Sequence, residues 1–127
     1  MRLVLAALMA LHGVAHLVGF AGAWQLAPAK EIPYKTTIFA GHVQVGDTGI
    51  RVLGILWLFA ALAFIVAAGG AVWSTQWWAR AALAVTSVSL VMTIVEWPEA
   101  RIGLIVNLAI LATLFLLFRP VVLGLNG

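Results

Sequence analysis

Cysteine is absent from this chain of 127 residues. Disulfide bonds, a thiolate nucleophile and cysteine-ligated zinc or iron–sulfur sites all need that side chain, so the sequence excludes them. Any metal or redox chemistry in this chain would have to use other residues.

Charged side chains are also scarce, at 9% of the residues, whereas 65% are hydrophobic. A soluble domain has about 25% charged and about 45–50% apolar residues. So few charges cannot cover a water-soluble protein, but a lipid bilayer removes this requirement because it is itself apolar. The seven Lys and Arg residues form no basic patch or stripe, so we expect no nucleic-acid partner.

The apolar residues fall into four runs, each long enough for a transmembrane helix of about 20 residues. The predicted spans cover residues 3–23, 48–68, 75–95 and 98–118, and a long loop covers residues 24–47. The runs lack period-two alternation and exceed the about 9–11 residues of a barrel strand. We therefore predict an all-α polytopic membrane protein, an antiparallel four-helix bundle with residues 1–127 as a single membrane domain.

The first run imitates a secretory signal peptide, because Arg2 precedes an apolar stretch that ends in Ala21-Gly22-Ala23. The apolar stretch is longer than the usual 7–15 residues or so of such peptides. It also contains His12 and His16. We therefore expect this segment to be retained as a true span.

The orientation in the membrane follows from the positions of Lys and Arg. On the side of the termini lie Arg2, Arg80 and Arg119, and on the other side lie Lys30, Lys35, Arg51 and Arg101. This distribution is nearly even. The larger loop is expected to face outward, which places both termini in the cytoplasm.

Polar residues within the spans concentrate toward the side of the long loop. With a helical rise of about 1.5 Å per residue, His16 and Asn107 both lie roughly 10 Å beneath that face, and His12 lies near the midplane. Glu96 lies at the rim, and Trp57 falls well inside the second span. Polar groups in a membrane usually face the bundle interior or a cavity. We therefore predict a pocket or polar network that includes His12, His16, Glu96, Asn107 and Trp57.

Small and polar residues share a helix face in the first and last spans. Gly19 continues the stripe of His12 and His16, and Gly103 lies one turn from Asn107. Such pairs allow helices to approach closely and to form hydrogen bonds. We expect these two spans to pack through the two stripes.

A metal site is one alternative, because His12 and His16 have the i, i+4 spacing of HExxH zinc sites. The residues between them include no glutamate, so further ligands would have to come from Glu96, Glu99 or His42. A haem is disfavoured within one chain, since two residues on one helix face cannot ligate both sides of the ring. The favoured interpretation is a histidine pair that fixes helix packing, with no cofactor.

Two further alternatives use the same residues. Neutral histidines near Glu96 could move protons on a lipid, a quinone or a similar apolar substrate. A transporter of this size would work as an oligomer, with a path lined by hydroxyl groups of the third span. Those groups belong to Thr86, Ser87, Ser89 and Thr93, and they can equally bond their own helix backbone.

Three short motifs carry a family resemblance. They are Leu11-His12-Gly13-Val14-Ala15-His16-Leu17-Val18-Gly19-Phe20, Gly54-Ile55-Leu56-Trp57-Leu58, and Trp97-Pro98-Glu99-Ala100-Arg101-Ile102-Gly103 with Asn107. Together they resemble small four-helix bacterial membrane proteins. The resemblance implies four spans in a bacterial cytoplasmic membrane, and no particular activity.

The sequence therefore favours a non-catalytic membrane protein that binds an apolar small molecule or acts as a subunit of a larger membrane complex. The expected partners are membrane lipids, an apolar small molecule, further copies of the chain or other membrane subunits. The competing hypotheses are a small membrane enzyme or a redox or metal-binding subunit that uses the face of His12 and His16, and an oligomeric transporter.

Overall fold

A computed structural model describes residues 1–26 and 34–125 of the chain. Its helices are α1 (Arg2–Ala23), α2 (Gly46–Val72), α3 (Trp78–Val95), α4 (Arg101–Leu117) and the short α5 (Arg119–Val122). A two-residue pair of strands, β1 (Thr37–Ile38) and β2 (Val43–Gln44), forms a small hairpin between α1 and α2. The predicted all-helical class is confirmed.

Three helices, α1, α2 and α3, are long and apolar enough to cross a membrane, and α4 is apolar but shorter, with 17 residues. Their surfaces reverse the pattern of a soluble protein. Large apolar side chains such as Leu11, Phe59 and Ile102 are more than half exposed, while six polar residues are buried. Those six are His12, His16, Thr86, Ser89, Thr93 and Asn107. Polar groups inside and apolar groups outside are expected of an integral membrane protein.

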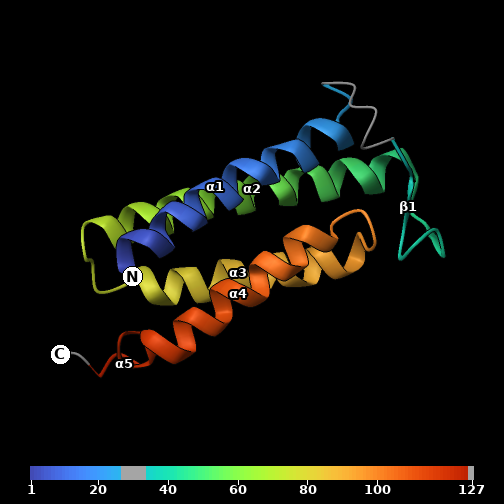
Figure 1. The fold of residues 1–127 in the computed structure, drawn as a ribbon. Helices are drawn as coiled ribbons and strands as arrows, with labels where there is room; N and C mark the ends of the chain where they lie inside the picture. Colours follow the sequence, from blue (N-terminus) through green and yellow to red (C-terminus); the bar gives the residue numbers. More distant parts are fainter. Residues whose placement is uncertain (27–33, 126–127) are drawn as a thin grey trace.

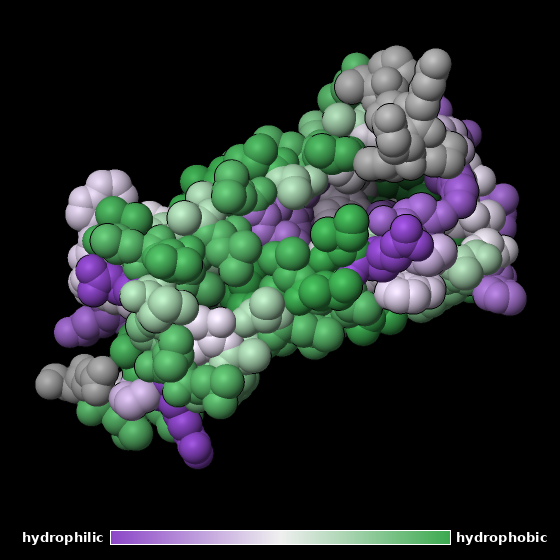
Figure 2. Space-filling model, viewed as in Figure 1, coloured by the Kyte–Doolittle hydropathy of each residue, from purple (hydrophilic) through white to green (hydrophobic). Residues whose placement is uncertain are grey.

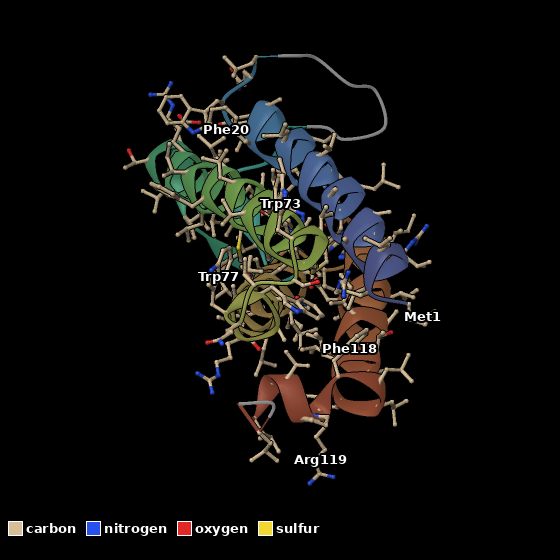
Figure 3. All side chains as sticks on the ribbon, turned by 90° about the vertical axis from the view of Figure 1, so that its left-hand side faces the viewer. Met1, Phe20, Trp73, Trp77, Phe118 and Arg119 are labelled. Atoms are coloured by element: carbon tan, nitrogen blue, oxygen red, sulfur yellow. The ribbon has the colours of Figure 1, made fainter. Side chains whose placement is uncertain are left out.

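The four long helices lie alongside one another (Figure 1). The turn from α2 to α3 lies at the same end as both termini, and the hairpin and the turn from α3 to α4 lie at the other end (Figure 1). Figure 3, viewed toward the first end, labels Met1, Trp73 and Trp77 there, and shows Arg119 pointing away from the helices. Tryptophan gathered at one end is typical of a membrane interface.

Helices α1 and α2 pack very closely because glycines lie between them. A Cβ atom added at Gly13 would lie 2.9 Å from the Phe64 Cβ atom, and one at Gly54 would lie 2.8 Å from the Ala23 Cβ atom. Close approach through small residues is a usual way for membrane helices to associate. The partner that α1 contacts most intimately is therefore α2.

The segment predicted as a long loop, residues 24–47, contains the hairpin. The Phe39 backbone N–H donates to the Val95 carbonyl at 2.8 Å, and the Ala40 N–H donates to the Trp97 carbonyl at 3.1 Å. These bonds hold the hairpin against the C-terminal end of α3. The part of this loop that spans residues 27–33, with Lys30 and Glu31, lies outside the described residues.

Three helix boundaries differ from the predicted spans by three residues or more, and one of them is the start of α3 at Trp78 rather than at residue 75. Helix α2 runs to Val72, four residues beyond the predicted end. It ends there because Ser74 adopts a positive φ of 54° and the Thr75 N–H donates to the Gly70 carbonyl. Helix α4 begins at Arg101 rather than at residue 98, because Pro98 belongs to a turn that the Arg101 N–H closes onto the Pro98 carbonyl. The end of α4 at Leu117 agrees with the predicted end within one residue.

Candidate functional site

A groove of about 830 Å³ runs between α1 and α4, and we call it the lateral groove. Its wall on α1 includes Leu8, Leu11, His12, Ala15, His16, Val18 and Gly19, and its wall on α4 includes Arg101, Ile102, Gly103 and Val106. Trp57 of α2, Thr93 of α3 and the turn from Glu96 to Ala100 complete it. Figure 2 shows hydrophilic surface recessed within a largely apolar face. The groove opens on the side of the molecule, where lipid would lie.

The base of the lateral groove is a set of hydrogen-bonded side chains from three helices, which we call the histidine network: His12, His16, Ser89, Thr93 and Asn107. His12 Nε2 lies 2.8 Å from Asn107 Oδ1, and His16 Nε2 lies 2.6 Å from Ser89 Oγ. Asn107 Nδ2 donates to Ser89 Oγ at 3.0 Å and to Thr93 Oγ1 at 3.4 Å. His16 Nδ1 donates to the His12 backbone carbonyl at 2.7 Å. The network therefore ties α1, α3 and α4 together.

Aromatic rings enclose the two histidines on the side of α2. The His16 ring centroid lies 4.8 Å from that of Trp57 and 5.1 Å from that of Phe64, and the His12 ring contacts the Phe64 ring edge-to-face at 5.0 Å. These rings exclude water from that side of the network. The Trp57 indole N–H is itself buried without a hydrogen-bond partner among the described residues.

A second cavity of about 410 Å³, the loop-side pocket, adjoins the lateral groove at the hairpin end. Both cavities are lined by Gly19, Glu96, Pro98 and Glu99. The hairpin contributes Thr37, Ile38 and Ala40 to the pocket wall. The shared residues form a common wall between the loop-side pocket and the lateral groove.

The two carboxylates on this shared wall have different surroundings. Burial raises the pKa of Glu96, and repulsion from Glu99 adds to this shift. The exposed Glu99 carboxylate accepts a hydrogen bond from Lys35, which lowers the pKa of Glu99. Glu96 therefore holds its proton to a higher pH than an ordinary glutamate does, on the wall of the groove.

All five residues predicted for the polar site line the lateral groove or its base. His12, His16, Trp57 and Glu96 line the groove, and Asn107 lies fully buried behind it. Within this set, Asn107 bonds His12, while His16 bonds Ser89. The Ser89 hydroxyl of α3 lies between His16 and Asn107 and bonds both of them.

Ser89 and Thr93 belong to the network although the sequence predicts them only as lining for a transport path, together with Thr86 and Ser87. Thr86, Ser89 and Thr93 recur at i, i+3 and i+7, which places them on one face of α3, and all three are buried. Ser87 lies off that face and donates to the Leu83 carbonyl of its own helix. The spacing in the sequence therefore distinguishes the buried residues Thr86, Ser89 and Thr93 from Ser87, which lies on another face of α3.

The predicted packing of α1 on α4 through the two stripes holds only at His12, which bonds Asn107 and lies 3.7 Å from a Cβ atom added at Gly103. A Cβ atom added at Gly19 would meet the Trp57 ring of α2 at 2.8 Å, so this glycine makes room for α2. At Gly103 the nearest atom to an added Cβ is the Thr93 methyl group of α3, at 3.1 Å. The bond from His12 to Asn107 does join α1 to α4, and the lateral groove occupies the space beside it.

The geometry also bears on the metal alternative. Among residues 1–26 and 34–125, no three His, Asp or Glu side chains lie close enough together to hold a metal ion. Both ring nitrogens of His16 are already engaged in hydrogen bonds. His42 lies exposed in the turn of the hairpin. The two cavities and the histidine network are therefore the features that can carry a function.

The chain was compared with protein-family models, curated proteins and solved structures, and none of them matches it.

Proposed function

We propose that this chain is an integral membrane protein whose four long helices cross the bilayer in alternating directions. Helices α1, α2 and α3 have the required length and apolarity. The 17 residues of α4 lie at the lower end of the range of about 17–25 residues for a transmembrane helix. The exposed apolar side chains and the buried histidine network support this arrangement, because lipid would contact the former and shield the latter.

Within that bundle, the lateral groove is a binding site for an apolar small molecule that enters from the bilayer. The observation that carries this proposal is the groove itself, because tightly packed membrane helices leave few such spaces. Its volume of about 830 Å³ falls within the range of about 300–1,000 Å³ for ligand pockets. Apolar side chains with a few convergent polar groups at the base are also typical of ligand sites.

The protein acts by binding rather than by catalysis in this proposal. The polar groups at the base of the groove are largely satisfied by one another, which favours a fixed structure. A protein of this kind could hold a lipid-like molecule by itself or present it to a partner subunit in the membrane.

The test is photolabelling of the protein in lipid nanodiscs with an alkyl diazirine. We expect saturable insertion into groove residues on α1, such as Leu8, Leu11 and Ala15, and on α4, such as Ile102 and Val106. An Ala15→Trp variant places an indole in the groove and should abolish this saturable component.

The matched control is Val88→Trp, which adds the same indole at an exposed position of α3 outside the groove. It should leave the saturable labelling unchanged. Labelling that is non-saturable and equally distributed over Val88, Val91 and the groove residues would overturn the binding proposal.

A further inference from the structure

The hydrogen-bond partners in the histidine network fix the direction of every bond in it. The starting point is the His12 backbone carbonyl, which can only accept a hydrogen bond. His16 Nδ1, at 2.7 Å from that oxygen, must therefore carry a proton. A neutral imidazole has one proton, so His16 Nε2 is bare and accepts a hydrogen bond from the Ser89 hydroxyl at 2.6 Å.

The next bonds follow from the single proton of Ser89. Because that proton is directed to His16, Ser89 Oγ can only accept from Asn107, and the atom it faces must be the amide nitrogen Nδ2. The Asn107 amide then presents its oxygen to His12. His12 Nε2, at 2.8 Å from Asn107 Oδ1, must therefore carry the proton of its own ring.

The remaining donors of the network are also used. The second Nδ2 proton of Asn107 points to Thr93 Oγ1, and the Thr93 hydroxyl donates to the Leu90 carbonyl at 2.8 Å. No carboxylate bonds either histidine among the described residues, and an extra charge in the membrane interior is costly, so both rings are neutral. The network therefore has one determined pattern of protons.

This pattern leaves one acceptor open, at His12 Nδ1. The atom carries no proton and has no hydrogen-bond partner among the described residues. Among the described residues, the fully buried side-chain nitrogen and oxygen atoms without a partner belong to Arg2, Trp57 and Thr86, so we infer that His12 Nδ1 retains accessible surface. Since His12 is otherwise buried and lines the lateral groove, that surface faces the groove.

We infer that the ligand of the lateral groove is a lipophilic alcohol whose hydroxyl group donates a hydrogen bond to His12 Nδ1. This inference rests on the proposed binding function and specifies its ligand class. A ligand that fills the groove expels water from Nδ1, and an unpaired buried acceptor is destabilising. A hydroxyl group of the ligand can donate a hydrogen bond to Nδ1. An ether, ester or quinone oxygen can only accept, so it would face the lone pair of Nδ1 and form no hydrogen bond.

The test compares dodecanol with dodecyl methyl ether, which have the same chain but differ in the hydroxyl proton. Wild-type protein labelled with ¹⁵N at histidine is studied by NMR in lipid nanodiscs. We expect the free protein to show His12 Nδ1 as an unprotonated nitrogen. Dodecanol should shift this resonance saturably, while the ether should leave it unshifted and bind at least about fivefold more weakly.

Two variants sharpen the comparison. Asn107→Leu removes the partner that holds the proton on His12 Nε2, so the ring can adopt the other tautomer. The preference for the alcohol over the ether should then fall to about twofold or less. Ser87→Ala removes a hydroxyl of α3 that bonds only its own helix in the described structure, and it should retain the full preference.

The possible failures are distinguishable. Equal binding of alcohol and ether, or a protonated His12 Nδ1 in the free wild-type protein, would overturn the alcohol inference and leave groove binding intact. If neither molecule binds saturably, both the inference and the proposed binding function are wrong.

Discussion

At the scale of single residues, Asn107 is the side chain on which the site depends most. Its amide oxygen bonds His12 of α1, and its amide nitrogen bonds Ser89 and Thr93 of α3. One residue therefore connects three of the helices that line the lateral groove, α1, α3 and α4. The position of the His12 proton depends on this amide, whereas the His12 backbone carbonyl fixes the proton of His16.

Replacement of Asn107 by alanine should destabilise the protein. The change leaves the His12 N–H without a partner and removes the hydrogen bonds that the Asn107 amide donates to Ser89 and Thr93. We expect a loss of about 1–2 kcal/mol in the free energy of unfolding. The measurement is reversible unfolding in mixed detergent micelles. Thr113→Ala on the same helix is the control, because Thr113 donates to the Ala109 carbonyl, and its cost should stay within about 0.5 kcal/mol. Equal losses in the two variants would contradict this role of Asn107.

Glu96 should give the stability a dependence on pH. Burial raises the pKa of Glu96 in the folded protein, so the folded state binds a proton more tightly than the unfolded state does. Stability from this group is then highest below the unfolded pKa and falls as pH rises through the folded pKa. Glu96→Gln should flatten this decline and stabilise the protein at neutral pH.

The same unfolding measurement, repeated from about pH 4 to about pH 8, tests this dependence. Glu99→Gln is the control, because Lys35 lowers the pKa of Glu99 and gives its contribution the opposite sign. A decline with rising pH that persists unchanged in Glu96→Gln would show that another group causes it.

At the scale of the elements, apolar run length predicted the helices well and their ends less well. Helices α1 and α3 begin and end within about three residues of the predicted spans, because long apolar runs leave no alternative to helix in a membrane. The predicted end of α2 is too early because Gly69 and Gly70 have the composition of a helix stop. They lie inside the helix, and Gly70 makes room for the ring of Trp77, which lies in the turn before α3. Such packing depends on a partner that the local sequence does not specify.

The close contact between α1 and α2 gives a prediction at this scale. Gly13→Ala should destabilise the bundle by about 1–3 kcal/mol, because the added Cβ atom would meet the Phe64 Cβ atom at 2.9 Å and the Ala61 carbonyl oxygen at 3.0 Å. Gly69→Ala is the matched control in α2. Its nearest neighbour is the edge of the Trp73 ring at 3.3 Å, and it should be neutral or stabilising by up to about 1 kcal/mol. A larger loss in Gly69→Ala than in Gly13→Ala would contradict the packing described for α1.

At the scale of the whole molecule, the sequence identified the polar residues of the site but not the space beside them. The cost of polar groups in a membrane predicted that His12, His16 and Asn107 would face inward, and they do. The sequence predicted a pocket or polar network but not a groove that opens between α1 and α4. The lateral groove arises because α1 packs on α2 and away from most of α4. That choice depends on side-chain shape along entire helices, with Gly13 and Gly19 turned to α2.

Four crossings of the membrane predict a definite arrangement of the connecting segments. Tyr34, beside the hairpin, should lie on the opposite side from Gln76, in the turn between α2 and α3, and from Leu125, near the C-terminus. Because the chain has no cysteine, Tyr34→Cys, Gln76→Cys and Leu125→Cys each introduce a single thiol. A membrane-impermeant maleimide applied to intact cells should label either Tyr34→Cys alone or the other two. Labelling of Gln76→Cys without Leu125→Cys would rule out a fourth crossing.

The groove between α1 and α4 can be observed directly by NMR of the protein in nanodiscs, with methyl labels on alanine and valine. Ala15 and Val106 line opposite walls of the lateral groove. Saturable intermolecular nuclear Overhauser effects from the methylene chain of one bound alcohol to both methyl groups are expected. A direct effect between Ala15 and Val106 that persists in the presence of the alcohol, with none from its chain, would show a closed seam in place of a binding site.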